Sequence, residues 1–305
     1  MELRQLEAVR EVVATGSVTA AAAVLHCTPS AVSQQLRAAE RLAGTALVEK
    51  DGRGIRPTAA GRALAARAAE VALAVERART AVEEFAGRPT GTVRVAAFQS
   101  AAELLFPPLL AAMAAHEGIT VECVEADVAQ EDFIDVTARA EVVVAHRPDR
   151  SAPFVAPDLH VTRLLREPLD VAVPPGHRLA GHDGVTPADL VGETWISVHE
   201  GFPIAGALHE LEARTGRPFD IRHRINDFHV IEALVASGEG VALLPRFAAG
   251  SGRDPRLRLL PLRGLRAGRL VEALARADRA ERRVVRTVLR ELREQAAVVA
   301  SSNSS

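Results

Sequence analysis

The chain has 305 residues, of which 48% are hydrophobic and 25% are charged, and its formal net charge at pH 7 is −2. This length accommodates two or three domains. The near-neutral charge excludes a chain that is basic throughout, so any surface for nucleic acid must be local. No apolar run reaches about 18 residues, so we expect no membrane span. Two cysteines far apart in the sequence, Cys27 and Cys123, indicate neither a disulfide framework nor a zinc site.

The first residues, MELRQLEAVREVV, mix acidic and basic side chains at helical spacing. They do not resemble a secretory signal, so we expect a cytoplasmic protein. The chain also lacks the HExxH, GxSxG and P-loop motifs. The stretch GEGVAL, at 238–243, lacks the third glycine of a dinucleotide fingerprint and follows a helical pattern. We therefore expect no enzymatic activity, no cofactor and no metal.

Two helices separated by a tight turn are predicted between residues 17 and 42. Ser17 is a candidate N-cap for the stretch VTAAAAVL, and HCT forms the turn. Thr28 is the next candidate N-cap, with Pro29 at the first helical position, where no N–H is needed. A helix, a short turn and a second helix make the helix-turn-helix pattern.

The second of these helices has two different faces. Val32, Leu36 and Ala39 follow the spacing of a buried stripe. The other face carries short polar and basic side chains, namely Ser30, Ser33, Gln34, Arg37 and Arg41. Such side chains hydrogen-bond base edges and phosphates in a major groove. A solvated helix face without a partner is the alternative interpretation.

The stretch LVEKDGRGIRPTAAG, from residue 47, predicts a short hairpin with glycines at its tip. It carries Lys50, Arg53 and Arg56. A basic hairpin behind a helix-turn-helix is typical of a wing that contacts phosphate or the minor groove. We expect Arg53 and Arg56 to contact DNA, with a solvated turn as the alternative.

A long helix is predicted from Thr58, as its N-cap, to Phe85. It would extend roughly 41 Å at about 1.5 Å per residue. Apolar side chains recur along it with alternating spacings of four and three, at Leu64, Ala68, Val71, Val75, Ala78, Val82 and Phe85. This seam is typical of a coiled coil. A single helix that lies on its own domain is the alternative.

After GRPTG, at 87–91, short β-branched strands alternate with helical stretches, which predicts an α/β domain with a mostly parallel sheet. Ser100 follows the first of these strands, beside the start of a helix. Two later connections from strand to helix, at 199–202 and 226–229, also carry polar and aromatic side chains. In open α/β sheets the carboxyl ends of strands line ligand sites.

The segment 3–61, LRQLEAVREVVATGSVTAAAAVLHCTPSAVSQQLRAAERLAGTALVEKDGRGIRPTAAG, resembles without a gap the winged helix-turn-helix of LysR-type transcriptional regulators. The stretches VRVAAFQS, FPPLLAAM, EPLDVAVPPGHRLAG and LVASGEGVALLP are similar to the effector domain of that family. The resemblance implies a winged helix-turn-helix DNA-binding domain at 1–60, a dimerising linker helix at 61–87 and an effector-binding domain at 88–300. The effector domain is expected to be a two-lobed α/β fold like a periplasmic binding protein, with lobe I at about 91–162 and 269–298 and lobe II at about 163–268.

The resemblance also implies a sequence-specific DNA-binding regulator that is modulated by a small-molecule effector in the cleft between the lobes. We expect it to bind a double-stranded operator, to pair as a dimer through the linker helix and to assemble into a tetramer. The residues expected to contact DNA are Thr28, Pro29, Ser30, Ser33, Gln34, Arg37, Arg53 and Arg56. A redox-sensing regulator that uses Cys123 is one alternative, and a cytoplasmic solute-binding protein is another.

The residues expected to contact the effector are Gln99, Ser100, His199, Phe202, Asn226 and His229. In the family the position of Ser100 lines the effector cleft, although Ser100 alone also suits a plain helix cap. The two histidines also suit a core or a surface position. Because no Arg or Lys is among these residues, a modest-sized polar or partly aromatic effector is favoured over a polyphosphate.

Overall fold

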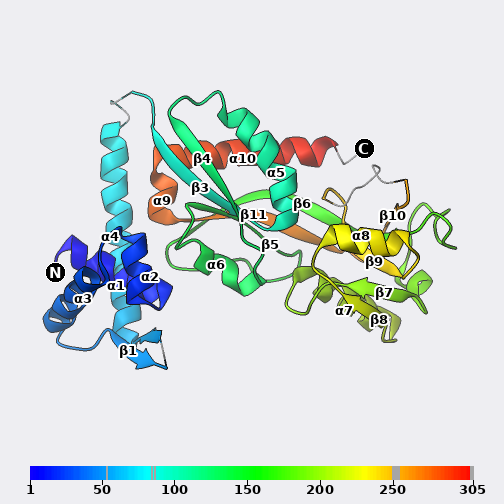
Figure 1. Cartoon of the computed structure of the whole chain (residues 1–305), viewed down its shortest axis with the longest axis horizontal. Coiled ribbons are helices and arrows are strands. Elements are labelled where there is room, and N and C mark those ends of the chain that lie inside the picture. The colour runs from blue at the N-terminus through cyan, green and yellow to red at the C-terminus, as the bar shows by residue number, and fades with distance from the viewer. Residues whose placement is uncertain (53, 84, 86, 249–254, 303–305) are drawn as a thin grey trace.

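The computed structural model describes residues 1–52, 54–83, 85, 87–248 and 255–302. Figure 1 shows a group of short helices at the N-terminal end, a long helix beside them and an elongated α/β body. No helix in the described part of the chain is long and apolar enough to cross a membrane. We call residues 1–57 the head and residues 91–302 the body.

The head contains three helices, α1 (Leu3–Thr15), α2 (Val18–Val24) and α3 (Pro29–Ala43). The Ser17 hydroxyl accepts a hydrogen bond from the N–H of Ala20, and the Thr28 hydroxyl accepts one from the N–H of Ala31, both at 3.3 Å. Both predicted N-caps are therefore confirmed. The apolar stripe of α3 is buried against the other two helices, so its opposite face is left outside.

The predicted hairpin consists of β1 (Val48–Asp51) and β2 (Gly54–Pro57), which pair antiparallel. Thr58 then caps the long helix α4 (Ala59–Glu83), because its hydroxyl accepts a hydrogen bond from the N–H of Gly61 at 3.0 Å. Gly61 touches the backbone of the segment before the hairpin. A Cβ at this position would lie 1.9 Å from the carbonyl oxygen of Leu47, so only glycine fits.

The helix α4 packs against α1 and against the short helix α9 (Ala277–Glu281) of the body. Ala68, a member of the predicted seam, is buried inside the chain. In contrast, Val71, Val82 and Phe85 are 39%, 70% and 92% exposed. One part of the seam therefore serves contacts within the chain, and the other part leaves apolar side chains uncovered.

The body is built on a continuous sheet with the order β4-β3-β5-β11-β6-β9-β7-β8, in which β10 also pairs with β6. The strands are β3 (Gly91–Ala97), β4 (Ile119–Glu125), β5 (Val142–Pro148), β6 (Leu159–Val173), β7 (Thr194–Ser197), β8 (Asp220–Arg224), β9 (Val241–Pro245), β10 (Arg258–Pro261) and β11 (Gly268–Arg276). Parallel pairs, such as β3 with β4 and β7 with β8, give the expected α/β character. The strand β11 pairs antiparallel with the first part of β6, from Leu159 to Pro168, and the rest of β6 continues into lobe II, where it pairs with β9 and β10.

Each half of this sheet has its own helices and its own apolar core. Lobe I carries α5 (Gln99–Met113), the turn η1 (Gln130–Asp132), α6 (Phe133–Val136), α9 and α10 (Arg283–Ser302). Lobe II carries the turn η2 (Pro187–Leu190), α7 (Pro203–Thr215) and α8 (Phe228–Ala236). The two lobes are joined by β6 and β11, and Figure 1 shows α5 and α10 over lobe I and α7 and α8 over lobe II.

The sequence predicts one helix over 278–297, whereas the structure divides this stretch into α9 and α10. Arg282 adopts an extended backbone, with ψ 131°, between α9 and α10. No glycine or proline stands at this point, so the local sequence gives no signal for the break. The break lets α9 contact α4 while α10 covers lobe I.

Candidate functional site

The outer face of α3 carries the side chains that the sequence assigns to DNA. Thr28, Pro29, Ser30, Gln34 and Arg37 are exposed, and Ser33 is half-buried. The hydroxyls of Thr28 and Ser30 lie 3.0 Å apart and share a hydrogen bond. Within the described residues, Arg37 has neither a hydrogen bond nor an ion pair. Its guanidinium is therefore available to an incoming base edge or phosphate.

The hairpin presents fewer free charges than its sequence suggests. Nη2 of Arg56 lies 2.6 Å from Oε1 of Glu49 on the neighbouring strand, and the two side chains are 63% and 49% exposed. An exposed pair of this kind contributes only about 0–1 kcal/mol, so phosphate can displace the carboxylate. Lys50 is exposed, and Arg53 lies outside the described residues.

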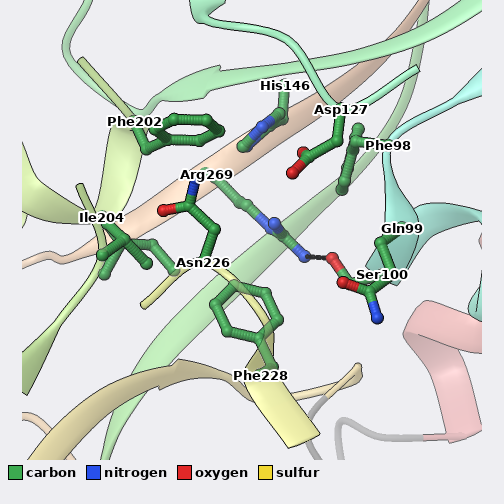
Figure 2. A pocket seen from close by; sticks show the side chains of 11 residues that line it. Phe98, Gln99, Ser100, Asp127, His146, Phe202, Ile204, Asn226, Phe228 and Arg269 are labelled. Carbon is green, nitrogen blue, oxygen red and sulfur yellow. Dashed lines mark hydrogen bonds between the residues drawn. The ribbon is translucent and has the colours of Figure 1, made fainter. Parts of the chain in front are cut away.

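A cavity lies between the two lobes, where the strand ends of lobe I face those of lobe II (Figure 2). It is lined by Phe98, Gln99, Ser100, Asp127, His146, Val198, Phe202, Ile204, Asn226, Phe228 and Arg269. Four of the predicted effector residues are thus brought together, namely Gln99, Ser100, Phe202 and Asn226. The cavity volume is about 30 Å³, which is room for about two water molecules. The lobes must therefore part before a metabolite can enter.

Ser100 reaches this cavity because β3 ends at Ala97 and α5 begins at Gln99. The N-cap is Phe98, so Ser100 lies in the first helical turn and is not the cap. Its side chain is 4% exposed. The N-terminus of α5 therefore points its free N–H groups and the positive end of its dipole toward the cavity.

The two predicted histidines do not line the cavity. His199 is exposed, and its backbone N–H donates a hydrogen bond of 2.9 Å to Oδ1 of Asn226, which orients that amide. His229 lies at the rim, where its Nε2 is 3.0 Å from Oε1 of Glu103 across the two lobes. Partial burial lowers the pKa of His229, but the carboxylates of Glu103, Glu232 and Asp227 outweigh it and raise the pKa overall.

The expectation that no arginine lies in the cleft is wrong. Arg269 of β11 reaches into the middle of the cavity, as Figure 2 shows, and is only 2% exposed. Its Nη2 lies 2.7 Å from Oε2 of Glu167 on β6 and donates a hydrogen bond of 2.9 Å to Oγ of Ser100. Its Cζ also lies 4.9 Å from the ring centroid of Phe98 and 5.9 Å from that of Phe228. The sequence predicts a strand over 270–276, LVEALAR, so Arg269 falls outside it and stands 169 residues after Ser100, which is why sequence reasoning missed it.

His146, two residues before the end of β5, is a second lining residue that the sequence did not reveal. It is 5% exposed, its ring stacks on Phe98 at 4.1 Å between centroids, and neither ring nitrogen has a hydrogen-bond partner among the described residues. Burial, together with the charge of Arg269, lowers the pKa of His146 far below its ordinary value. The imidazole is therefore neutral at physiological pH.

Asp127, which follows β4, also lines the cavity. Burial and the neighbouring Glu125 raise the pKa of this carboxyl, while Arg269 opposes them. No hydrogen bond to the Asp127 side chain is present within residues 1–52, 54–83, 85, 87–248 and 255–302, which the structure describes. The Asp127 carboxyl, which is exposed, is thus available to a ligand at the wall of the cavity.

The cysteines offer little support for the redox alternative. Cys123 is half-buried on β4, and Cys27 is exposed in the turn before α3. Burial raises the pKa of the Cys123 thiol. A raised pKa reduces the fraction of reactive thiolate, whereas thiol sensors depend on a lowered one.

Two protein-family models match the chain. The model described as a bacterial regulatory helix-turn-helix protein of the lysR family matches residues 3–62, and the LysR substrate binding domain matches residues 86–297. The regulatory protein OccR of the octopine catabolism/uptake operon in Rhizobium meliloti is 29% identical over 83% of each chain. The regulator CbbR of Xanthobacter flavus is 30% identical over 86% of this chain and 78% of its own.

Solved structures of full-length regulators share the fold. A full-length variant of OxyR from Pseudomonas aeruginosa has a TM-score of 0.69 at 20% identity and covers 96% of this chain and 98% of its own. CbnR in complex with its target DNA has a TM-score of 0.55 at 22% identity and covers 97% of this chain and all of its own. The resemblance in the sequence is confirmed by the family models, which together span the head and the body. Members of the family are oligomeric regulators that bind operator DNA and effectors, and the chain belongs to this LysR family of bacterial transcriptional regulators.

Proposed function

We propose that α3 enters the major groove of an operator, with Ser33, Gln34 and Arg37 directed at base edges or phosphates. Thr28, Pro29 and Ser30 would set the start of the helix against the DNA backbone, and the hairpin would contact phosphate through Arg56. The observation that carries this proposal is the exposed polar face of α3, opposite a stripe that is buried in the head. We also propose that the protein acts in the cytoplasm and is not an enzyme, because it belongs to a family of DNA-binding regulators.

The test is a gel-shift titration on the DNA upstream of the gene that encodes this protein. Arg37→Ala should weaken specific binding by about 1–3 kcal/mol if the guanidinium is bidentate to guanine. Arg217→Ala is the matched control, because Arg217 is an exposed arginine of lobe II, far along the chain from the head. If both variants bind the promoter like the unmodified protein, α3 does not read the groove.

We also propose that the cavity between the lobes is the effector site. Its lining comes from both lobes, and β6 and β11 are the connections about which the lobes can part. An effector that binds one arrangement of the lobes more tightly shifts the population toward that arrangement. The new arrangement of the lobes would change the relative position of the paired heads and so their contact with the operator. A metabolite screen by thermal shift on the full chain tests the site, since a bound ligand raises the melting temperature by mass action.

A further inference from the structure

The wall of the inter-lobe cavity carries one basic and one acidic side chain, Arg269 and Asp127, and Arg269 is paired with the buried Glu167 rather than with Asp127. Figure 2 shows the guanidinium of Arg269 and the carboxylate of Asp127 on the same cavity, and the described residues contain no ion pair between them. We propose that the cavity selects a zwitterionic amino acid, which offers one carboxylate and one ammonium group. This inference rests on the proposed role of the cavity as the effector site.

The subsite for the carboxylate is built around Arg269. One carboxylate oxygen of Glu167 binds its Nε and Nη2, and the other accepts the N–H groups of Phe247 and Ala248 at 2.8 and 2.9 Å. Glu167 is therefore fully occupied and holds the guanidinium in place. Nη1 of Arg269 has no hydrogen bond among the described residues. Because Ser100 accepts a hydrogen bond from Arg269, its own hydroxyl hydrogen is free to donate.

The start of α5 strengthens this subsite. The first N–H groups of a helix have no partner within the helix and carry a partial positive charge. A carboxylate placed between Nη1 of Arg269 and Ser100 would meet these groups as well. Since Arg269 is almost fully buried in the protein, such a contact is shielded from water and is correspondingly strong.

The subsite for the ammonium group is Asp127. The Asp127 carboxyl is exposed at the cavity wall and has no hydrogen-bond donor from the described chain, so an ammonium group can reach it. Burial and Glu125 raise the pKa of this carboxyl, and the charge of a bound ammonium group would lower that pKa and favour the ionised form. A ligand with a carboxylate alone would therefore approach a like charge at Asp127. A ligand with an ammonium group alone would leave Nη1 of Arg269 and the start of α5 without an acceptor. Only a molecule that carries both a carboxylate and an ammonium group can occupy the two subsites together.

The rest of the lining fits the other parts of such a molecule. Phe202, Phe228 and Ile204 form an apolar wall for a side chain, and the Asn226 amide offers one polar contact. His146 is neutral and adds no charge. The cavity thus combines a small apolar volume with one anion subsite and one cation subsite.

The experiment is a thermal-shift and calorimetry series on the full chain with the proteinogenic amino acids, each in millimolar excess. Each amino acid that raises the melting temperature is compared with two analogues, the acid that lacks its amino group and the amine that lacks its carboxyl group. We expect at least one amino acid to bind and each of its analogues to bind at least tenfold more weakly. The inference is overturned if no amino acid binds, or if either analogue binds as well.

Asp127→Asn tests the assignment more strictly, because it should change which ligand binds and not only weaken binding. This variant should bind the amino acid at least tenfold more weakly and the matched acid more tightly than the unmodified protein does, because the like charge is removed. Asp132→Asn, at an exposed aspartate that does not line the cavity, is the control and should behave like the unmodified protein. An unchanged preference in Asp127→Asn would contradict the assignment. Promoter binding is measured in parallel, so a regulator that binds DNA but no amino acid refutes this inference alone.

Discussion

The Nη1 atom of Arg276 donates a hydrogen bond of 2.8 Å to the carboxylate of Glu11, and this pair joins the body to the head. The two side chains are 4% and 1% exposed. A second ion pair, between Arg10 of α1 and Asp278 of α9, lies beside it at 2.7 Å. Since Arg276 ends the strand that begins next to Arg269, one strand carries both the contact with the cavity and the contact with the head.

Arg276→Met should destabilise the chain by about 1–3 kcal/mol, because buried Glu11 would lose its closest partner and keep only Arg10, whose Nη2 lies 3.1 Å from Oε1 of Glu11. The double variant Glu11→Leu with Arg276→Met should recover much of this loss, since two apolar side chains can replace a buried pair. Urea unfolding of the two single variants and the double variant measures the coupling. Purely additive losses would show that the two side chains do not interact.

The position of His146 predicts a loss of stability in mild acid. Its pKa is lower in the folded protein than in the unfolded chain, so the unfolded chain binds the proton first as the pH falls. The contribution of neutral His146 to the free energy of unfolding is therefore fully present above the ordinary histidine pKa of about 6.5. Below that pH it declines by about 1.4 kcal/mol per pH unit. His146→Phe, which keeps an aromatic ring against Phe98, should lack this component. Urea unfolding of the unmodified protein and of His146→Phe gives the free energy of unfolding over about one pH unit below that ordinary pKa. If it falls equally with pH in both proteins, other groups cause the acid sensitivity.

Ser100→Ala should separate ligand binding from folding. Arg269 keeps its pair with Glu167, so the free energy of unfolding should fall by only about 0.5–1.5 kcal/mol, the usual cost of one hydrogen bond. The affinity for the ligand found in the thermal-shift series should fall by a similar amount, or by up to about 3 kcal/mol at a charged group. Calorimetry measures the affinity and a gel shift the promoter binding. Equal ligand affinities would remove Ser100 from the site.

The apolar seam on α4 indicates that two copies of the chain pair through this helix. Val71→Asp with Val75→Asp should prevent pairing, because two charges would be buried without partners. Light scattering should show a smaller species, and promoter affinity should fall as the heads are no longer coupled. Arg67→Asp with Arg79→Asp places the same acidic side chains at exposed positions outside the seam and should keep the oligomer. An unchanged mass in the first variant would place the interface elsewhere.

Local sequence signals were sufficient to predict the helices and the hairpin of the head. Capping residues such as Ser17 and Thr28 fix where helices begin, and the glycines of the hairpin fix its tip, so these elements could be predicted from short stretches. The cavity was harder, because its lining depends on which strands become neighbours. Residues directly after predicted strands, such as Ser100 and Asn226, were found.

Arg269, His146 and Asp127 were missed for a related reason. Arg269 meets Ser100 only because β11 inserts between β5 and β6, and no spacing in the sequence reports that pairing. His146 follows the continuous apolar run VVVA of β5, which has no polar alternation to show which face each side chain takes. His199 and His229 have the right position in the sequence, but their side chains lie outside the cavity.

The insertion of β11 between β5 and β6 also constrains how the protein emerges from the ribosome. In the sheet, Pro148 of β5 faces Arg269 of β11, which lies about 120 residues later in the chain. At about 5–20 residues per second, the buried strand β5 waits roughly 6–24 s for this neighbour. During that interval lobe II can fold, while lobe I keeps an open hydrophobic edge that other chains can pair with. Chains that end before β11 should therefore aggregate rather than bind DNA as a shortened regulator.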